Sequence, residues 1–156
     1  MLNVDIPGFG IVSIKHLVSD FTGTLSEDGR LCKGVQDRLK ELSENLQIHI
    51  LTADTFGKAR DELRNINCTI RILEGTDHDV QKGQYVQKLG VDNVFALGNG
   101  NNDRNMLEAA RVGVAVCLIE GCATDCIASA NILVTSITDG LDLLLNPKRL
   151  KATLRF

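Results

Sequence analysis

Short apolar runs alternate with amphipathic segments along this chain, and this alternation restricts the fold more than any other feature. The apolar runs are a few residues long and bounded by polar residues or glycine, which is typical of buried parallel strands. They cover residues 14–19, 47–51, 68–73, 93–97, 112–118 and 131–134. The segments between them are predicted to be helices, several with apolar residues at helical spacing, over residues 35–46, 56–66, 79–89, 103–111, 121–130 and 137–145.

Strands that alternate with helices across short connections form right-handed βαβ units, with helices on both faces of the sheet. We therefore predict an α/β fold, a Rossmann-like three-layer α/β/α sandwich with a mostly parallel central sheet. No linker or repeat interrupts the pattern, and 156 residues suit a single domain over 1–156. The first residues differ: 2–6, the turn 7–10 and 11–19 predict an N-terminal β-hairpin that leads into the first central strand. Residues 26–30 predict a second tight turn.

Composition excludes several classes of partner. The formal charge is −3, whereas nucleic acids and anionic membranes favour a basic surface, so neither is expected as a partner. No apolar run approaches the roughly 20 residues that cross a bilayer, and we see no signal peptide at the N-terminus. The five cysteines include no CxxC pair, which favours buried thiols in the cytoplasm over a metal or redox site. His16, His49 and His78 have no metal-site spacing and are expected to be structural.

Polar residues follow the apolar runs at the points where a parallel sheet binds its ligands, beyond the carboxyl ends of the strands. Asp20 follows the first run, Thr52 and Ala53 follow the second, and Gly-Asn-Gly-Asn-Asn-Asp at 98–103 follows the fourth. Lys82 lies near the start of the helix before that fourth strand. Singly, each residue has an ordinary explanation as a helix cap, a turn residue or a solvated side chain. Together, they predict a site at one edge of the sheet.

The chemistry of these residues suggests phosphoryl transfer. A carboxylate such as Asp20 can attack phosphorus and carry the phosphoryl group, which splits one difficult displacement into two easier steps. Attack by an anion on an anionic phosphate needs positive charge, which a Mg²⁺ ion held by Asp20 and Asp103 and the ammonium of Lys82 would supply. Thr52 and backbone N–H groups of the glycine-bearing turns would hold the phosphate oxygens.

The segment Asp-Phe-Thr-Gly-Thr-Leu at 20–25 resembles the first motif of the haloacid dehalogenase-like (HAD) superfamily, in the form used by P-type ATPases. Thr52 is similar to the second motif, Lys82 to the third, and 98–103 resembles the GDGxND of the fourth. The chain most resembles soluble P-type ATPase-like phosphatases. The resemblance implies that Asp20 is the nucleophile and that the backbone carbonyl of Thr22 ligates Mg²⁺ together with Asp20, Asn99 and Asp103.

The resemblance also implies contacts with a substrate. We expect Thr52, Ala53, Lys82 and Asn102 to contact its phosphate. The intervals 24–52 and 55–82 are too short to contain a cap domain, so a capless HAD enzyme with an open site is predicted. Such a site suits a small phosphorylated substrate or a phosphorylated macromolecule, and a neighbouring subunit of a homo-oligomer could close it. The basic C-terminal stretch 147–156 is expected to be a tail that packs back or lies in solvent, with a subunit contact as the alternative.

Two positions depart from the family pattern. HAD phosphatases usually have an aspartate at the position of Thr22 as general acid and base, a function worth about 10²–10⁴-fold in rate. Thr22 therefore predicts a slowly hydrolysed aspartyl phosphate. Asn99 stands where the motif has a Mg²⁺-binding aspartate, which predicts weak, roughly millimolar Mg²⁺ binding. An Asn99→Asp variant that binds Mg²⁺ no more tightly would refute this explanation.

Two alternatives to an active enzyme remain. Thr22 and Asn99 also suit a degenerate phosphate-binding or regulatory module with little catalysis. A receiver-like signalling domain is disfavoured, because receivers have an acidic pair after the first strand and a phosphoacceptor after the third, and this chain has neither.

Overall fold

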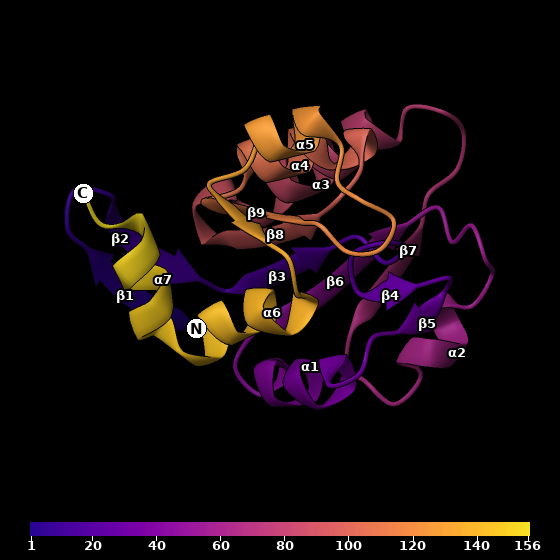
Figure 1. The fold of residues 1–156 in the computed structure, drawn as a ribbon, viewed down its shortest axis with the longest axis horizontal. Coiled ribbons are helices and arrows are strands. Elements are labelled where there is room, and N and C mark those ends of the chain that lie inside the picture. Colours follow the sequence, from indigo (N-terminus) through magenta and orange to yellow (C-terminus); the bar gives the residue numbers. More distant parts are fainter.

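The computed structural model describes residues 1–156, and a sheet of six parallel strands forms its centre. The strand order is β10-β9-β8-β3-β6-β7, so the chain winds outward from β3 in both directions (Figure 1). The strands are β3 (His16–Ser19), β6 (Gln47–Thr52), β7 (Thr69–Ile72), β8 (Val94–Gly98), β9 (Val112–Val116) and β10 (Ile132–Val134). Each lies within a predicted apolar run or differs from it by one residue, and the predicted α/β fold is confirmed.

Helices cover both faces of this sheet (Figure 1). One face carries α1 (Val35–Ser43), α2 (Ala59–Leu63) and α6 (Ile137–Leu145), and the other α3 (His78–Leu89), α4 (Arg104–Ala109) and α5 (Thr124–Ala128). Successive strand residues point to opposite faces: Leu17 lies in the larger apolar core with α1 and α6, and Val18 lies in the smaller core with α3 and α4. Several helices are shorter than predicted, because their apolar periodicity continues into the turns that follow.

Two antiparallel hairpins complete the strands; the N-terminal one was predicted as a hairpin, and the second lies where a tight turn was predicted. The N-terminal one pairs β1 (Leu2–Ile6) with β2 (Gly10–Ile14) and leads through Lys15 into β3. The other pairs β4 (Ser26–Glu27) with β5 (Arg30–Leu31) directly after the loop that carries Asp20. Two short 3₁₀ helices, η1 (Val91–Asn93) and η2 (Asn101–Asp103), flank β8.

The C-terminal stretch packs back as expected, but as a helix. α7 (Pro147–Leu154) begins with a proline in its first turn, a favoured position for that residue, and buries Leu150 completely. The backbone N–H of Phe156 donates to Pro7 O at 3.1 Å, which ties the chain end to the N-terminal hairpin. The hairpin and α7 lie at the end of the molecule opposite β4, β5 and β7 (Figure 1). None of the helices is long and apolar enough to cross a lipid bilayer.

Candidate active site

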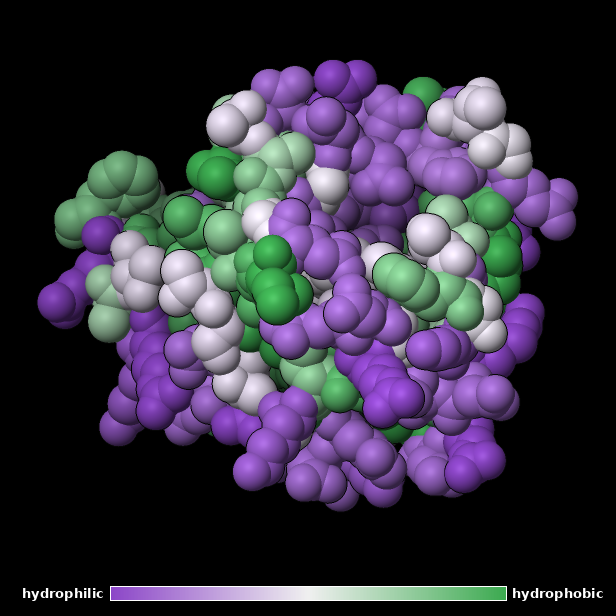
Figure 2. All heavy atoms as spheres, turned by 45° about the vertical axis from the view of Figure 1, so that its right-hand side comes forward, coloured by the Kyte–Doolittle hydropathy of each residue, from purple (hydrophilic) through white to green (hydrophobic).

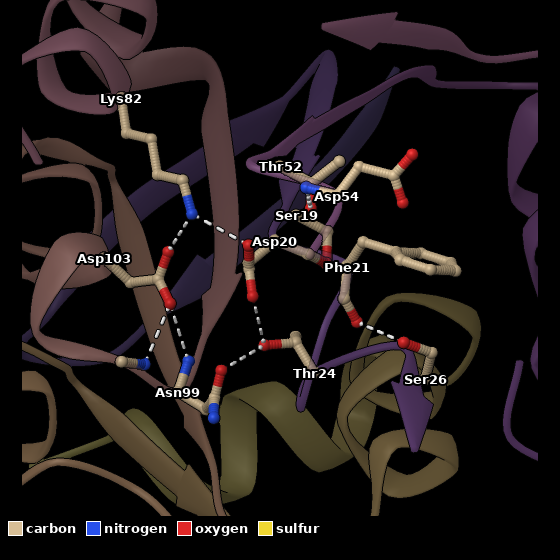
Figure 3. A network of polar contacts seen from close by, with 11 residues as sticks. Ser19, Asp20, Phe21, Thr24, Ser26, Thr52, Asp54, Lys82, Asn99 and Asp103 are labelled. Atoms are coloured by element: carbon tan, nitrogen blue, oxygen red, sulfur yellow. Dashed lines mark hydrogen bonds and ion pairs between the residues drawn. The ribbon is translucent and has the colours of Figure 1, made fainter. Parts of the chain in front are cut away.

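Asp20 occupies the middle of the sheet edge at the carboxyl ends of the strands. It follows β3, which is paired with β6 on one side and β8 on the other. Its backbone N–H donates to Leu97 O at 3.0 Å, and the Ser19 hydroxyl donates to its carbonyl oxygen at 2.7 Å. These bonds hold the residue in line with the strand, and its carboxylate points toward the side chains of Lys82 and Thr24 (Figure 3). The side chain is nearly buried, with 6% of the residue exposed.

Lys82 joins the two carboxylates that the sequence singled out. Its Nζ donates to Asp20 Oδ1 at 2.8 Å and to Asp103 Oδ1 at 2.7 Å (Figure 3). Lys82 and Asp103 are both fully buried. A buried ammonium between two carboxylates is retained only where each charge is compensated. Residues separated by 62 and 21 positions along the chain thus meet at the predicted sheet edge, where they form an ionic cluster.

Burial and mutual contact shift the pKa values within this cluster. Burial raises the pKa of the Asp20 carboxyl to about 6; Lys82 opposes the rise and Asp103 adds to it. Burial alone lowers the pKa of Lys82, but the carboxylates of Asp20 and Asp103 outweigh that effect and hold its pKa above the ordinary value. At neutral pH, therefore, Asp20 is an anion beside a fixed positive charge.

Asp103 also organises the loop after β8. Its Oδ2 accepts the backbone N–H groups of Asn99 and Gly100, each at 2.9 Å, while Oδ1 accepts from Lys82. Gly98 makes this possible, because a Cβ at that position would lie 2.5 Å from Asp103 Cβ and 2.6 Å from Cγ. The glycine at the end of β8 is therefore required for the close approach of the carboxylate.

Two oxygen acceptors face each other on the other side of Asp20. The hydroxyl of Thr24 lies 3.4 Å from Asp20 Oδ2 and 3.1 Å from Asn99 Oδ1. One O–H group supplies a single proton, so these contacts leave one of the two acceptors without a donor at any moment. The Asn99 amide is oriented by its Nδ2, which donates to Gly121 O at 3.3 Å. A carboxylate oxygen and an amide oxygen that converge in this way fit a Mg²⁺ ion, which prefers oxygen ligands.

The other predicted site residues lie at the same edge with different contacts. Thr52 is buried at the end of β6, and its hydroxyl accepts the backbone N–H of Asp54 at 2.9 Å, so it forms the local turn that we had considered as its ordinary explanation. Ala53 is exposed and Asn102 is partly buried within η2. The Thr22 hydroxyl is buried with no hydrogen-bond partner.

Two residues of this region were not singled out by the sequence. Thr24 belongs to the first motif, but its hydroxyl contacts with Asp20 and Asn99 were not anticipated. Glu120 lies in the turn after β9, and its Oε2 would be 2.6 Å from a Cβ placed on Gly23. No motif or spacing signals Glu120, because 100 positions separate it from Asp20.

Comparison with known proteins shows which sequences resemble this chain. Residues 51–118 match the family model of haloacid dehalogenase-like hydrolases. An uncharacterized protein of Methanocaldococcus jannaschii is 50% identical over 62 residues, which are 40% of this chain and 67% of that protein.

Three solved structures have similar folds. A cobalt-bound deoxy-D-mannose-octulosonate 8-phosphate phosphatase of Haemophilus influenzae has a TM-score of 0.71 and 12% identity, over 92% of this chain and 94% of its own. The corresponding Moraxella catarrhalis enzyme, in complex with magnesium, phosphate and a KDO molecule, has a TM-score of 0.61 and 20% identity, over 91% and 94%. The catalytic domain of the CPx-ATPase CopB-B has a TM-score of 0.60 and 28% identity, over 74% of this chain and 46% of its own.

The family match lies on β6 through β9, the part of the chain that supplies Thr52, Lys82, Asn99 and Asp103. Asp20 lies outside that match, but its contact with Lys82 joins it to the same cluster. The chain belongs to the haloacid dehalogenase-like superfamily of hydrolases.

Proposed function

We propose that this protein is a Mg²⁺-dependent phosphohydrolase that acts on phosphomonoesters through an aspartyl phosphate on Asp20. The observation that carries the proposal is the bond from Lys82 Nζ to Asp20 Oδ1, because it places a fixed positive charge on a carboxylate at the sheet edge. Membership of a hydrolase family supports the same reaction class.

The reaction would proceed in two displacements at phosphorus. In the first, an Asp20 oxygen forms a bond to phosphorus, the ester P–O bond breaks, and the alcohol leaves with a proton from solvent. In the second, water attacks the same phosphorus, the acyl phosphate P–O bond breaks, and inorganic phosphate leaves with the Asp20 carboxylate restored. We assign the attack to Oδ1, beside Lys82, because Oδ2 faces Thr24 and Asn99.

Several residues of the chain would stabilise the negative charge of the transferred phosphoryl group. Lys82 would stabilise the negative charge that develops on the transferred group. Thr52 and Ala53 at the end of β6, with Asn102 in η2, would contact the phosphate oxygens.

Asp20, Asn99 and the backbone carbonyl of Thr22 would hold the cation. Bound there, Mg²⁺ would neutralise charge on the phosphoryl oxygens and orient them for in-line attack. Both Asp103 oxygens already accept N–H donors. We therefore propose that Asp103 interacts with the cation through its water shell.

Thr22 would make the second displacement slow. A threonine hydroxyl does not act as a general base near neutral pH, and the loss of that function costs about 10²–10⁴-fold in rate. We therefore expect the aspartyl phosphate to accumulate, with a burst of product followed by slow turnover.

The substrate would be a phosphorylated small molecule or macromolecule. Between Asp20 and Lys82 the chain forms only β4, β5, α1, β6, α2, β7 and the first turn of α3, and no cap domain is inserted there. The face turned forward in Figure 2 is largely hydrophilic, with a few hydrophobic patches and a hollow above its centre, which suits a polar ligand. We propose the cytoplasm as the compartment, because all five cysteines are free.

Trapping of the phosphorylated residue tests the proposal. Incubation with acetyl phosphate or p-nitrophenyl phosphate and Mg²⁺, followed by acid quenching and mass spectrometry, should show one phosphoryl group, on Asp20. An Asp20→Asn variant should show none, and an Asp54→Asn variant, changed just beyond the end of the neighbouring strand β6, should label normally. Labelling of Asp20→Asn, or phosphate release unchanged by it, would contradict the proposal.

A further inference from the structure

Hydrogen bonds hold the turn after β9 beside Asn99. The backbone N–H of Gly121 donates to Leu118 O at 2.9 Å, which closes the turn, and Ala123 N donates to Asn99 O at 2.8 Å. The Asn99 side chain in turn donates to Gly121 O at 3.3 Å. Glu120 lies within this turn, so its backbone is held beside the loop that carries Asn99.

The Glu120 carboxylate reaches over the first-motif loop. A Cβ built on Gly23 would lie 2.6 Å from Glu120 Oε2 and 2.5 Å from Asn99 Nδ2, so both groups occupy the space that the glycine leaves open. Gly23 has a φ of +76° and lies between Asp20 and Thr24. Glu120 takes part in none of the five ion pairs of the structure. An uncompensated carboxylate therefore lies beside Asn99, above the Asp20 loop.

An asparagine at position 99 is compatible with the nearby Glu120 carboxylate, whereas an aspartate at this position would not be. Its amide Nδ2 donates to Gly121 O, which directs Oδ1 toward Thr24 and Asp20. An aspartate in the same conformation would place a carboxylate oxygen against that carbonyl and near Glu120, and acceptors with negative charge repel at such distances. The neutral side chain at 99 and the charged one at 120 are therefore compatible as a pair.

We propose that Glu120 supplies the negative charge that Asn99 lacks, and that it stabilises the cation bound between Asp20 and Asn99. Mg²⁺ retains several of its waters in proteins, so a carboxylate beside the site can act through one of them. Glu120 is exposed, and its contribution is therefore screened by salt. This inference rests on the proposed function, since it assigns a residue to the cation of that reaction.

Direct measurement of metal binding tests the inference without reference to turnover. Free Mn²⁺ is measured by electron paramagnetic resonance as the full chain is titrated, with Mg²⁺ added as the competitor. Glu120→Gln should weaken Mn²⁺ binding by about three- to tenfold at low ionic strength, and by less at about 0.5 M salt. Glu44→Gln is the matched control: it removes the same charge from an exposed residue beside Gln47, at the amino end of β6, and should bind Mn²⁺ like the wild type.

A double variant that moves the negative charge from position 120 to position 99 provides a second test. In Asn99→Asp/Glu120→Gln the carboxylate returns to position 99, and Mn²⁺ binding should recover at least to the wild-type affinity, because the total charge is restored and lies closer to the cation. Wild-type affinity in Glu120→Gln, or equal weakening in Glu44→Gln, would overturn the assignment while leaving the proposed function intact. If the wild-type chain binds no Mn²⁺ at all, both the assignment and the Mg²⁺ dependence are wrong.

Discussion

The Lys82 ammonium lies 2.8 Å from the Asp20 carboxylate at a position that solvent does not reach. Lys82 comes from the second turn of α3 and Asp20 from the end of β3, so the pair joins one helical layer to the sheet. The same nitrogen neutralises part of the charge on Asp103. The stability of the fold and the proposed reaction at Asp20 therefore both depend on the Lys82 ammonium.

Replacement of Lys82 by methionine should destabilise the chain strongly. The change leaves Asp20 and Asp103 as neighbouring buried carboxylates without a counter-ion, and removal of one member of a buried ionic cluster costs about 3–5 kcal/mol. Urea unfolding in the absence of divalent metal measures the loss. Lys88→Met, at an exposed position on the same helix, should change stability by less than about 0.5 kcal/mol. Equal stability of the two variants would refute the role of the cluster.

Gly98→Ala should lower the rate of phosphate release strongly and reduce the stability of the fold only moderately. The new Cβ would lie 2.5 Å from Asp103 Cβ, so Asp103 must move away from Lys82 and from the loop that it organises. A displacement of about 1 Å in a catalytic group can cost about 100-fold in rate, whereas overpacking costs about 1–3 kcal/mol. Steady-state phosphate release and urea unfolding report the two effects. Gly140→Ala, where the Cβ meets only side-chain methyl groups at 3.3 Å and 3.5 Å, should retain activity; loss of activity in both variants would contradict this explanation.

Thr22→Asp should shorten the lifetime of the aspartyl phosphate. A carboxylate at this position can accept a proton from the attacking water, which is worth about 10²–10⁴-fold. Decay of the labelled Asp20 after removal of the phosphate donor measures the rate. Thr22→Asn has a similar shape and no proton-accepting carboxylate, so its decay should remain slow. A Thr22→Asp variant with unchanged decay would show that another group limits hydrolysis.

Acid should destabilise the fold through His49. Its ring nitrogens lie 3.1 Å from His16 Nδ1 and 3.0 Å from the Tyr85 hydroxyl. Burial, and secondarily the charge of His16, lowers its pKa from 6.5 to about 4. Between these values the unfolded chain binds a proton that the folded chain does not. Stability is therefore greatest above the unfolded-state pKa and decreases as the pH falls toward 4.

Urea unfolding at several pH values measures this effect. The expected loss attributable to His49 is about 1–2 kcal/mol between about pH 7 and pH 5. His49→Gln retains hydrogen-bonding capacity without a titrating ring, so its stability should depend less on pH over this interval. Asp20, whose pKa is about 6, remains in the variant, so its contribution cancels in the comparison. Parallel pH curves for the two chains would show that His49 does not contribute.

The sequence by itself determined the sheet and the edge at which Asp20, Lys82 and Asp103 lie. Apolar runs that end in Asp20 and Gly98 predict strands whose carboxyl ends share one edge, because parallel strands present their ends together. A helix that begins just before Lys82 brings that residue to the same edge. These inferences succeed because burial of a strand and periodicity of a helix are recorded in neighbouring residues.

Only the tertiary structure decided the rest of the site. The orientation of the Asn99 amide depends on Gly121 O, and the position of Glu120 depends on how the turn after β9 packs over Gly23. The C-terminal helix was also missed, although Pro147 and the spacing of Leu150 and Leu154 are compatible with one. Side-chain orientations of this kind are set by the packing of layers against one another, and no local pattern of residues records them.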